Sequence, residues 1–540
     1  MAAPPNIPQR KPAPNNKLIE QKKEIDTLLQ QGIALQNKGK LNEARTIFEK
    51  IITIDSNHFD ALHLLGVVFA QIQSFQLADE FLSKALTINP NHSACSNNRG
   101  NVLKELKRFE EALSSYDKAI SIKPDNAEAY FNRGIVLQEL KRFEEALSSY
   151  DKAISIKPDY ANAYLNRGLV LQELKRLDEA LSSYDKAISV KADYAEAYSN
   201  RGLVLQELKR FEEALSSFDK AISIKADYAN AYWNSSLCHL LNGNLIKGWQ
   251  RYEWRWHKEG GSMSASKRNF PQPLWLGGEP LKDKTILIYF EQGFGDTIQF
   301  CRYVPLVAAL GAKVIFEVQP QLLKLLSNLE GVSQIIARGD PLPHFDYQCP
   351  LMSLPLAFKT ELDTIPAPPQ KVEPDKDKVI AWEKKLGEKK KLRVGIVWSG
   401  STANIKGRHR SLPLSALIAH LPSDYDYVSL QKEICDADKL LLTEHHQIRQ
   451  YSNDLKDFTD TAALIELMDV VISVDTSVAH LSATLGKSTW MMLPFAPDWR
   501  WLLDIDDSPW YSSVKLYRQE KTNDWHGVLE KIKSDLKLFR

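Results

Sequence analysis

The chain of 540 residues is long enough for two to four domains, each with its own large apolar core. Its 69 Lys and Arg side chains almost balance 68 Asp and Glu side chains, so the net charge of +1 excludes a general electrostatic attraction to nucleic acid or to an anionic membrane. No stretch approaches the roughly 18 apolar residues that a membrane span requires.

The first 20 residues are predicted to be a disordered, proline-rich tail. They carry five prolines and no apolar core, a composition that suits neither a signal peptide nor a stable element. The five cysteines of the chain are odd in number and form no CxxC pair, so neither a disulfide framework nor a zinc site is predicted. We therefore expect a reducing, cytoplasmic location.

Small residues recur every 34 residues through the first half of the chain. A fixed period of this length predicts stacked helical hairpins that cross at the small side chains. The pattern resembles the tetratricopeptide repeat, which implies an all-α superhelix over residues 21–258 with six clear units and a decaying seventh from Ala229. The repeated positions are Gly32, Gly66, Gly100, Gly134, Gly168 and Gly202, with Ala44, Ala78, Ala112, Ala146, Ala180 and Ala214.

Asparagine keeps the same spacing on the expected first helix of five units. A side-chain amide can donate to and accept from a peptide backbone at once. A regularly spaced row of asparagines, here called the asparagine ladder, could therefore bind a polypeptide of any sequence. The array of the protein O-GlcNAc transferases is similar, and it implies a protein or peptide partner in the groove. The alternative is that asparagine was duplicated passively with the near-identical repeats. The ladder comprises Asn98, Asn132, Asn166, Asn200 and Asn234.

The array is expected to end in an aromatic capping segment, GWQRYEWRW, because it contains too many large rings for a free linker. From about residue 281 short β-rich runs alternate with helical segments, which predicts parallel sheets covered by helices. A proline-rich stretch at 365–374 divides the series, so we expect two Rossmann-like domains, at 275–370 and 375–540. Strands are expected at 285–290, 313–318, 333–336, 345–349, 393–398, 425–430, 470–474 and 490–493, with helices at 297–310 and 322–329.

Three polar loops follow expected strands. After 285–290, the turn EQGFGD contains Gln292, two glycines that let the backbone turn tightly, Gly293 and Gly295, and Asp296 at the start of a helix. Helix capping by Asp296 is the alternative to a catalytic role. After 393–398, Lys406, Arg408 and Arg410 form a cationic cluster suited to phosphate, although exposed basic clusters are usually only solvated.

The third loop, Asp475-Thr476-Ser477, joins the expected strand 470–474 to a helix. The N-terminus of a helix at the carboxyl end of a buried strand favours an anion. Simple capping of the helix by one of these residues is equally open. His480, three residues after Ser477, either contacts the anion or packs on the helix.

Several motifs agree in order and spacing with one family. EQGFGDTIQFCRYVP, VGIVWSGS with RSLPL, VSLQKE, DTSVAHLSATLGK and DWRWLL resemble the bacterial tetratricopeptide-repeat glycosyltransferases related to the heptosyltransferases. The resemblance implies a GT-B fold with Asp296 as catalytic base and Arg410 as a phosphate-binding cation. It places Gln431, Asp475, Thr476, Ser477 and His480 at the donor. Gln292, Gly293 and Gly295 are expected on the acceptor side. Heptosyltransferases have DTGLSH where this chain has DTSVAH, which leaves the donor sugar open.

Together these patterns favour an enzyme that moves a sugar from a nucleotide diphosphate to an acceptor hydroxyl. The acceptor is expected on a polypeptide held by the array, with inversion at the anomeric carbon. No metal or cofactor is expected beside the nucleotide sugar, although Asp504-Ile-Asp506 matches the Asp-x-Asp pattern of metal-dependent transferases. The rival hypothesis is a non-catalytic repeat scaffold with a degenerate GT-B domain. Neither a nucleic acid partner nor a membrane span is expected.

Overall fold

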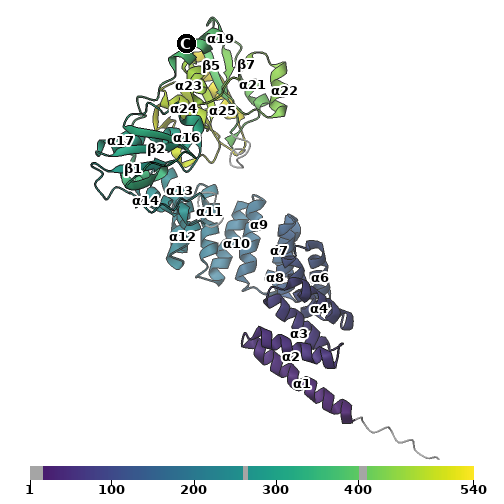
Figure 1. Cartoon of the computed structure of the whole chain (residues 1–540). Coiled ribbons are helices and arrows are strands. Elements are labelled where there is room, and N and C mark those ends of the chain that lie inside the picture. Colours follow the sequence, from purple (N-terminus) through teal and green to yellow (C-terminus); the bar gives the residue numbers. More distant parts are fainter. Residues whose placement is uncertain (1–15, 259–265, 401–409, 540) are drawn as a thin grey trace, which may run out of the picture. The chain divides into compact units, whose positions relative to one another are not determined.

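The computed structural model describes residues 16–258, 266–400 and 410–539 (Figure 1). The chain separates into two compact units, and the boundary between them falls after Val204, inside a helix. In the described residues of the first unit, the only regular elements are helices, joined by short turns. The second combines the last repeat helices with two β-sheets.

The first unit consists of antiparallel helix pairs at the predicted 34-residue period. The small side chains are required where the two helices of a pair cross: a Cβ on Gly134 would lie 2.5 Å from Cε1 of Tyr150, which is fully buried in the second helix. The predicted repeat array is therefore confirmed. Its helices are α1 (Asn16–Asn37), α2 (Leu41–Ile54), α3 (Phe59–Gln71), α4 (Phe75–Ile88), α5 (Ser93–Glu105), α6 (Phe109–Ile122), α7 (Ala127–Glu139), α8 (Phe143–Ile156), α9 (Ala161–Glu173), α10 (Leu177–Val190) and α11 (Ala195–Glu207), which crosses into the second unit.

The second unit opens with the end of the repeats. These elements are α12 (Phe211–Ile224), α13 (Ala229–Leu241), α14 (Leu245–Tyr252) and the 3-10 turn η1 (Glu253–Trp256). The aromatic segment is packed as predicted, because Trp249 and Tyr252 are almost completely buried and Trp249 Nε1 donates to the carbonyl of Thr360 at 3.2 Å. Tyr232 and Trp254 stack with ring centroids 4.0 Å apart. The end of the array is thus joined to the α/β part by buried rings.

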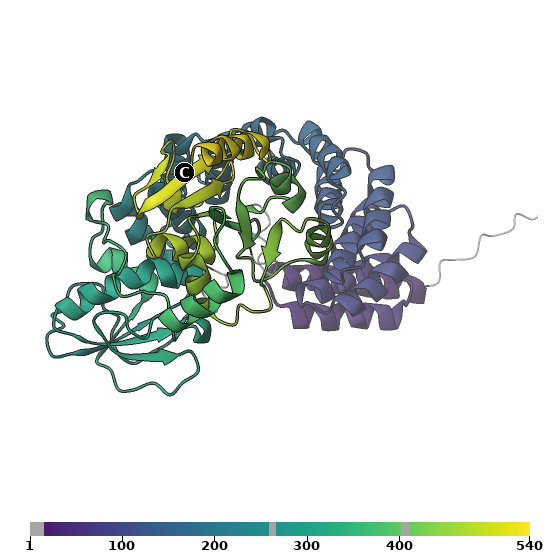
Figure 2. The ribbon, with the colours of Figure 1, turned by 90° about the horizontal axis from the view of Figure 1, so that it is seen from above.

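A parallel four-stranded sheet follows, in the order β3-β2-β1-β4. Its strands lie beside one another in teal and green in Figure 2. The predicted helix at 297–310 is interrupted by a 3-10 turn, and the predicted helix at 322–329 is wrong, since turns replace it after Leu322. The elements are β1 (Thr285–Tyr289), α16 (Phe294–Phe300), η2 (Cys301–Tyr303), α17 (Val304–Ala309), β2 (Lys313–Val318), η3 (Pro320–Leu322), β3 (Val332–Ala337), β4 (Tyr347–Pro350), η4 (Leu351–Ser353), α18 (Leu354–Ala357) and η5 (Leu362–Thr364).

The larger sheet has seven strands in the order β10-β11-β9-β8-β5-β6-β7, all parallel except β10 at one edge. Its central strands β5, β8 and β9 are buried along their whole length, which explains their continuous apolar runs. The sequence prediction missed β7, β10 and β11. The elements are α19 (Lys376–Leu386), β5 (Arg393–Val397), α21 (Leu414–Ile418), β6 (Asp426–Ser429), α22 (Asp436–Glu444), β7 (Ile448–Gln450), α23 (Phe458–Glu466), β8 (Val470–Val474), α24 (Ser477–Thr484), β9 (Thr489–Leu493), η6 (Trp499–Trp501), β10 (Asp507–Ser508), β11 (Tyr511–Arg518) and α25 (His526–Leu538).

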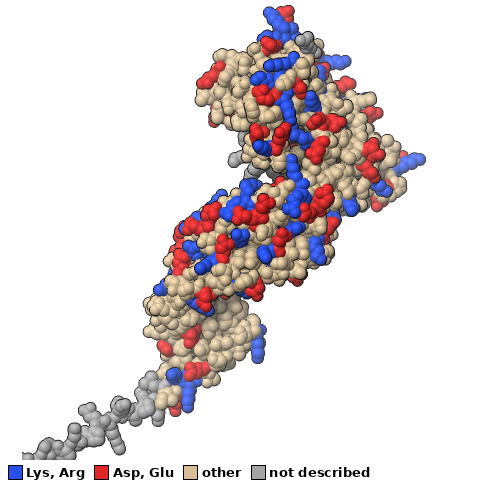
Figure 3. All heavy atoms as spheres, turned by 180° about the vertical axis from the view of Figure 1, so that it is seen from behind, with Lys and Arg blue, Asp and Glu red and all other residues tan. Residues whose placement is uncertain are grey.

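The surface of the chain carries both signs of charge. On the face drawn in Figure 3, Lys and Arg side chains alternate with Asp and Glu over the repeat helices and gather in no patch of one sign. Within residues 16–258, 266–400 and 410–539, no helix has the length and apolar character needed to cross a bilayer.

Candidate functional site

Strand β8 ends at Val474, and the turn that follows it leads directly into α24. Thr476 is the N-cap residue: its hydroxyl accepts from the backbone N–H of Ala479 at 3.4 Å and lies 3.1 Å from the hydroxyl of Ser473. The capping role expected for this loop therefore falls on Thr476. Ser477 begins the helix, so the first free N–H groups of α24 lie beside its backbone.

Asp475 is the acidic centre of this turn. Its side chain is only 9% exposed, and its carboxylate lies 3.5 Å from Nε2 of His480 and 3.6 Å from Nη1 of Arg410. Burial by itself would raise the pKa of the Asp475 carboxyl. The hydrogen bond and charge of His480, together with the guanidinium of Arg410, outweigh burial and hold that pKa well below its usual value.

The His480 ring is fixed on both sides. Its Nδ1 lies 3.1 Å from the hydroxyl of Tyr511, and its plane stacks on the ring of Trp501 with centroids 5.4 Å apart. The ring therefore packs against Trp501 and Tyr511 and also holds Asp475, while its contact with an anion remains a prediction. Arg410 is the one member of the predicted cationic cluster that the structure describes, since Lys406 and Arg408 lie outside the described residues.

Asp296 lies at the start of α16, on the side of the smaller sheet. One carboxylate oxygen accepts from the N–H of Gly293 at 2.8 Å, which is the predicted capping contact. The other oxygen accepts from Nη2 of Arg500, a residue of η6 that the sequence reasoning did not assign to the site. Asp296 thus caps its own helix and also forms an ion pair with Arg500, which follows strand β9 of the larger sheet.

Arg500 is 6% exposed and is held by several acceptors. It donates to Oδ1 of Asp498 at 2.8 Å and to Oε1 of Gln299 at 2.7 Å, and its guanidinium lies over the ring of Trp499 at 4.2 Å. Asp296 and Gln299 lie on successive turns of α16, so the Arg500 guanidinium holds that helix at two points. The only sequence signal for Arg500 was its place in the motif DWRWLL. Its neighbours Trp499 and Trp501 are buried.

The two helix N-termini meet at Gly295. Figure 1 shows α16 directly below α24, and the two helices are in contact. A Cβ on Gly295 would lie 2.9 Å from Cδ2 of His480 and 3.5 Å from Cα of Ser477, so only glycine permits this approach without a shift. The starts of α16, which carries Asp296, and of α24, which carries Ser477 and His480, therefore meet at a common seam.

Two predicted residues have mainly structural contacts. Gln431 is 5% exposed; its amide donates to the carbonyls of Ser399 at 2.9 Å and Glu433 at 3.1 Å, which ties together the ends of two neighbouring strands. Gln292 donates through Nε2 to the hydroxyl of Tyr252 at 2.7 Å. Asp504 and Asp506 precede the short edge strand β10, and within the described ranges no group of three His, Cys, Asp or Glu side chains is placed to hold a metal ion.

The asparagine ladder lies on α5, α7, α9, α11 and α13, the first helix of each unit, as the period predicts. Its first rungs already have partners inside the array. The amide nitrogen of Asn98 lies 3.0 Å from Nε2 of His63, and that of Asn132 donates to Oδ1 of Asn97 at 3.4 Å. Asn166 and Asn200 are half-buried.

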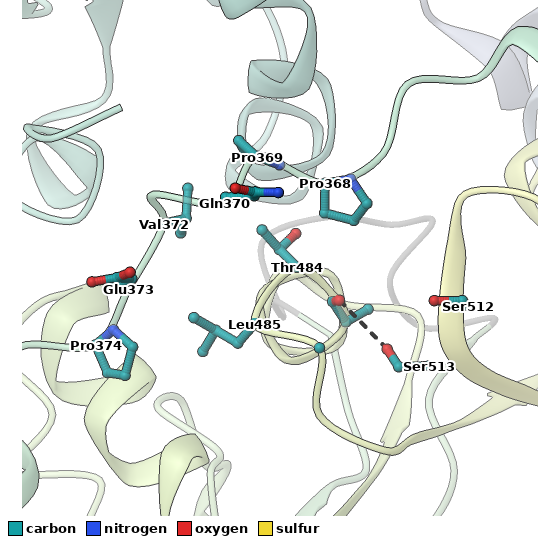
Figure 4. Close-up of a pocket in the computed structure, with 12 residues that line it drawn as sticks. Pro368, Pro369, Gln370, Val372, Glu373, Pro374, Thr484, Leu485, Ser512 and Ser513 are labelled. Carbon is teal, nitrogen blue, oxygen red and sulfur yellow. Dashed lines mark hydrogen bonds between the residues drawn. The ribbon is translucent and has the colours of Figure 1, made fainter. Parts of the chain in front are cut away.

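A separate cavity of about 370 Å³ lies at the other end of α24 (Figure 4). The proline-rich linker lines one side through Pro368 and Pro369, and Thr484, Leu485 and Ser513 line the other. None of the predicted site residues borders this cavity. The candidate site is therefore the seam at the N-terminal end of α24.

Comparisons with known proteins identify the repeats. The family described as TPR repeat matches residues 100–141 and 139–175, and the family described as tetratricopeptide repeat matches 25–58, 59–92 and 159–227. Protein FlbA of Caulobacter vibrioides is a distant homologue, 25% identical over 324 residues, which cover 55% of this chain and 53% of FlbA. The chain thus spans about half the length of that relative.

Solved structures with similar helices include pilF of Pseudomonas aeruginosa, which is 22% identical, covers 39% of this chain and 96% of its own, and has a TM-score of 0.36. YrrB, described as a TPR protein with an unusual peptide-binding site, is 25% identical, covers 34% of this chain and 95% of its own, and has a TM-score of 0.31. The chain is a tetratricopeptide-repeat protein, and these matches leave the α/β region that follows its repeats unassigned.

Proposed function

We propose that this protein is a glycosyltransferase of the GT-B type, related to the heptosyltransferases, which moves a sugar from a nucleotide diphosphate to an acceptor hydroxyl with inversion. The observation that carries the proposal is the seam at Gly295. There, a carboxylate at the start of α16 and the N-terminus of α24 come together from the carboxyl ends of strands in two different sheets. Ligands of α/β proteins bind at such strand ends, and a helix N-terminus favours phosphate.

Asp296 is proposed as the general base. Its side chain is 22% exposed, so an acceptor hydroxyl can reach it, and the contacts from Gly293 and Arg500 fix its orientation. Removal of the hydroxyl proton by a positioned carboxylate contributes a factor of roughly 10² to 10⁴. Attack on the face opposite the leaving diphosphate then inverts the anomeric carbon.

The charge that develops on the diphosphate is proposed to be met by Arg410 and by the backbone N–H groups of Thr476 and Ser477. Preorganised donors of this kind stabilise a leaving anion without reorganisation. Asp475 orients both Arg410 and His480, through contacts of 3.6 and 3.5 Å. Because protein cations and a helix N-terminus supply the positive charge, the mechanism requires no metal ion.

The test uses UDP, GDP, ADP and CMP sugars with the wild type and Asp296→Asn. We expect one donor class to raise the thermal midpoint of both proteins, since binding to the folded state alone stabilises it. We expect turnover, as transfer or slow hydrolysis of the donor, to fall by about 10²- to 10⁴-fold in the variant. Absence of both binding and turnover with every donor would refute the enzyme and favour the rival proposal, a repeat scaffold without catalysis.

The repeat array is proposed to hold a polypeptide acceptor. The observation that favours this is the recurrence of asparagine on the first helix of five units, because amides pair with a peptide backbone regardless of its sequence. Asn98 and Asn132 have partners within the array, and Asn166, Asn200 and Asn234 are half-buried, so these last three are proposed to contact the peptide.

A further inference from the structure

The last repeat contacts the loop that immediately precedes the helix carrying the proposed base. Tyr252, the final residue of α14, is 2% exposed, and its hydroxyl accepts from Nε2 of Gln292 at 2.7 Å. The tyrosine ring is enclosed by Trp233, Trp249 and Trp499, with centroids 5.0, 6.2 and 6.5 Å away. Such a ring cannot turn freely, so its hydroxyl presents a fixed acceptor to the loop between β1 and α16.

Arg255, three residues further on, makes a second connection to the same loop. Its side chain is fully buried; Nη2 donates to Oε1 of Glu291 at 3.1 Å and to Oγ of Ser353 at 2.7 Å, while Nη1 donates to Oε1 of Glu253 at 2.6 Å. Glu291 also accepts from the backbone N–H of Met352 at 3.2 Å. One guanidinium therefore bridges the end of the repeats, the loop and η4.

These contacts lead directly to Asp296. Gln292 is fixed through its amide by Tyr252 and through its carbonyl by Gln319, whose Nε2 donates to it at 3.0 Å. The next residue, Gly293, supplies the N–H that binds one oxygen of the Asp296 carboxylate. Fixing residues 291 and 292 therefore sets the direction of that N–H group.

The other oxygen of Asp296 is held by Arg500, and the last repeat reaches this contact too. Helix α13 packs against η6, and the rings of Tyr252 and Trp499 lie edge to face. Both hydrogen-bond donors to the carboxylate are thus supported by side chains from the repeats.

We infer that Tyr252 and Arg255 are positioning residues for Asp296, so that the end of the repeat array is a structural part of the catalytic centre. This inference rests on the proposed glycosyl transfer. It assigns the array a role in catalysis that is separate from holding an acceptor. A change at either residue alters the chemical step and leaves donor binding at Arg410 and α24 intact.

The test is Tyr252→Phe, which keeps the packed ring and removes only the hydroxyl. The matched control is Tyr232→Phe, a residue of the same repeat whose ring stacks on Trp254. We expect kcat to fall by about 10- to 100-fold in Tyr252→Phe, because a small displacement of a catalytic group has an effect of this size. The KM for the donor and the thermal midpoint should stay close to wild type, and the control should keep its kcat within about twofold.

A second measurement does not depend on activity. Hydrogen exchange at the backbone amides of residues 291–296 should become faster in Tyr252→Phe and stay unchanged in Tyr232→Phe, because only Tyr252→Phe removes the acceptor that fixes the Gln292 side chain in this loop. An unchanged kcat or unchanged exchange in Tyr252→Phe would overturn the positioning role. Absence of turnover by the wild type, in contrast, would refute the proposed function itself. Arg255→Lys retains the charge but not the bridging geometry, and it should reproduce the loss of kcat.

Discussion

Glu291 shows how strongly a single residue of the site loop depends on its surroundings. Its carboxylate is 2% exposed and shares the Arg255 guanidinium with Glu253. Burial raises the pKa of Glu291 to about 7; Arg255 opposes this shift, and the nearby carboxylates of Glu253 and Asp296 add to it. The side chain therefore changes its charge near neutral pH, next to the proposed base.

This pKa predicts how stability depends on pH. Because the folded-state pKa of about 7 lies above the ordinary value of 4.5, the folded protein binds the proton more tightly than the unfolded chain. The resulting stabilisation is complete below pH 4.5 and is lost as the pH rises through 7. We expect the unfolding free energy of the wild type, relative to Glu291→Gln, to fall by about 3 kcal/mol across this window.

Urea denaturation of both proteins at intervals between pH 5 and pH 8 measures this difference. The variant keeps the shape of the side chain and cannot ionise, so other titrating groups affect both proteins alike. Parallel stability curves would show that Glu291 titrates normally.

At the scale of elements, the local sequence pattern predicted strands with a continuous apolar run well and predicted segments without such a run poorly. The apolar run at 470–474 became β8 (Val470–Val474), and a helix followed at Ser477, because a strand buried on both faces needs a continuous apolar sequence. The segment at 322–329 has leucines at helical spacing, yet it forms turns, since apolar spacing alone does not determine backbone conformation. Strand β11 was missed because its exposed and buried residues alternate irregularly.

The repeat helices carry the prediction for acceptor binding. Replacement of Asn166 and Asn200 by Ala should weaken binding of a labelled, unstructured Ser/Thr-rich peptide by about 30-fold, because each of the two lost hydrogen bonds to a peptide contributes about 1 kcal/mol. Fluorescence anisotropy measures the affinity. Asn42→Ala, an exposed asparagine on the second helix of its repeat, is the control. Equal peptide affinity in the double variant would show that the asparagines were only duplicated with the repeats, while donor binding should not change in either protein.

At the scale of the whole molecule, the compact unit that contains both sheets begins at Leu205, well before the α/β sequence pattern starts. Trp249, Tyr252 and Arg255 are nearly or fully buried in this unit. The end of the repeats therefore belongs to the core that supports the sheets.

This organisation predicts different behaviour for two fragments. Residues 195–540 should unfold in a cooperative thermal transition. Residues 259–540 lack the buried rings of Trp249 and Tyr252, at roughly 3 to 5 kcal/mol each, and also the Arg255 guanidinium that bridges Glu291 and Ser353. Since a domain is stable by only about 5 to 15 kcal/mol, the shorter fragment should show no cooperative transition in calorimetry. A cooperative transition in residues 259–540 would mean that the repeats are dispensable for folding of the sheets.

The sequence by itself determined the repeat period, the alternation of strands and helices, and the three polar loops that follow strands. These features depend on the local spacing of apolar, small and polar residues, so they can be recognised without knowing which segments meet. Only the tertiary structure decided that Arg500 pairs with Asp296, 204 residues away, and that Tyr252 and Arg255 hold the same loop. Nothing local distinguishes these side chains from other arginines and tyrosines, because their partners are chosen by the packing of distant elements.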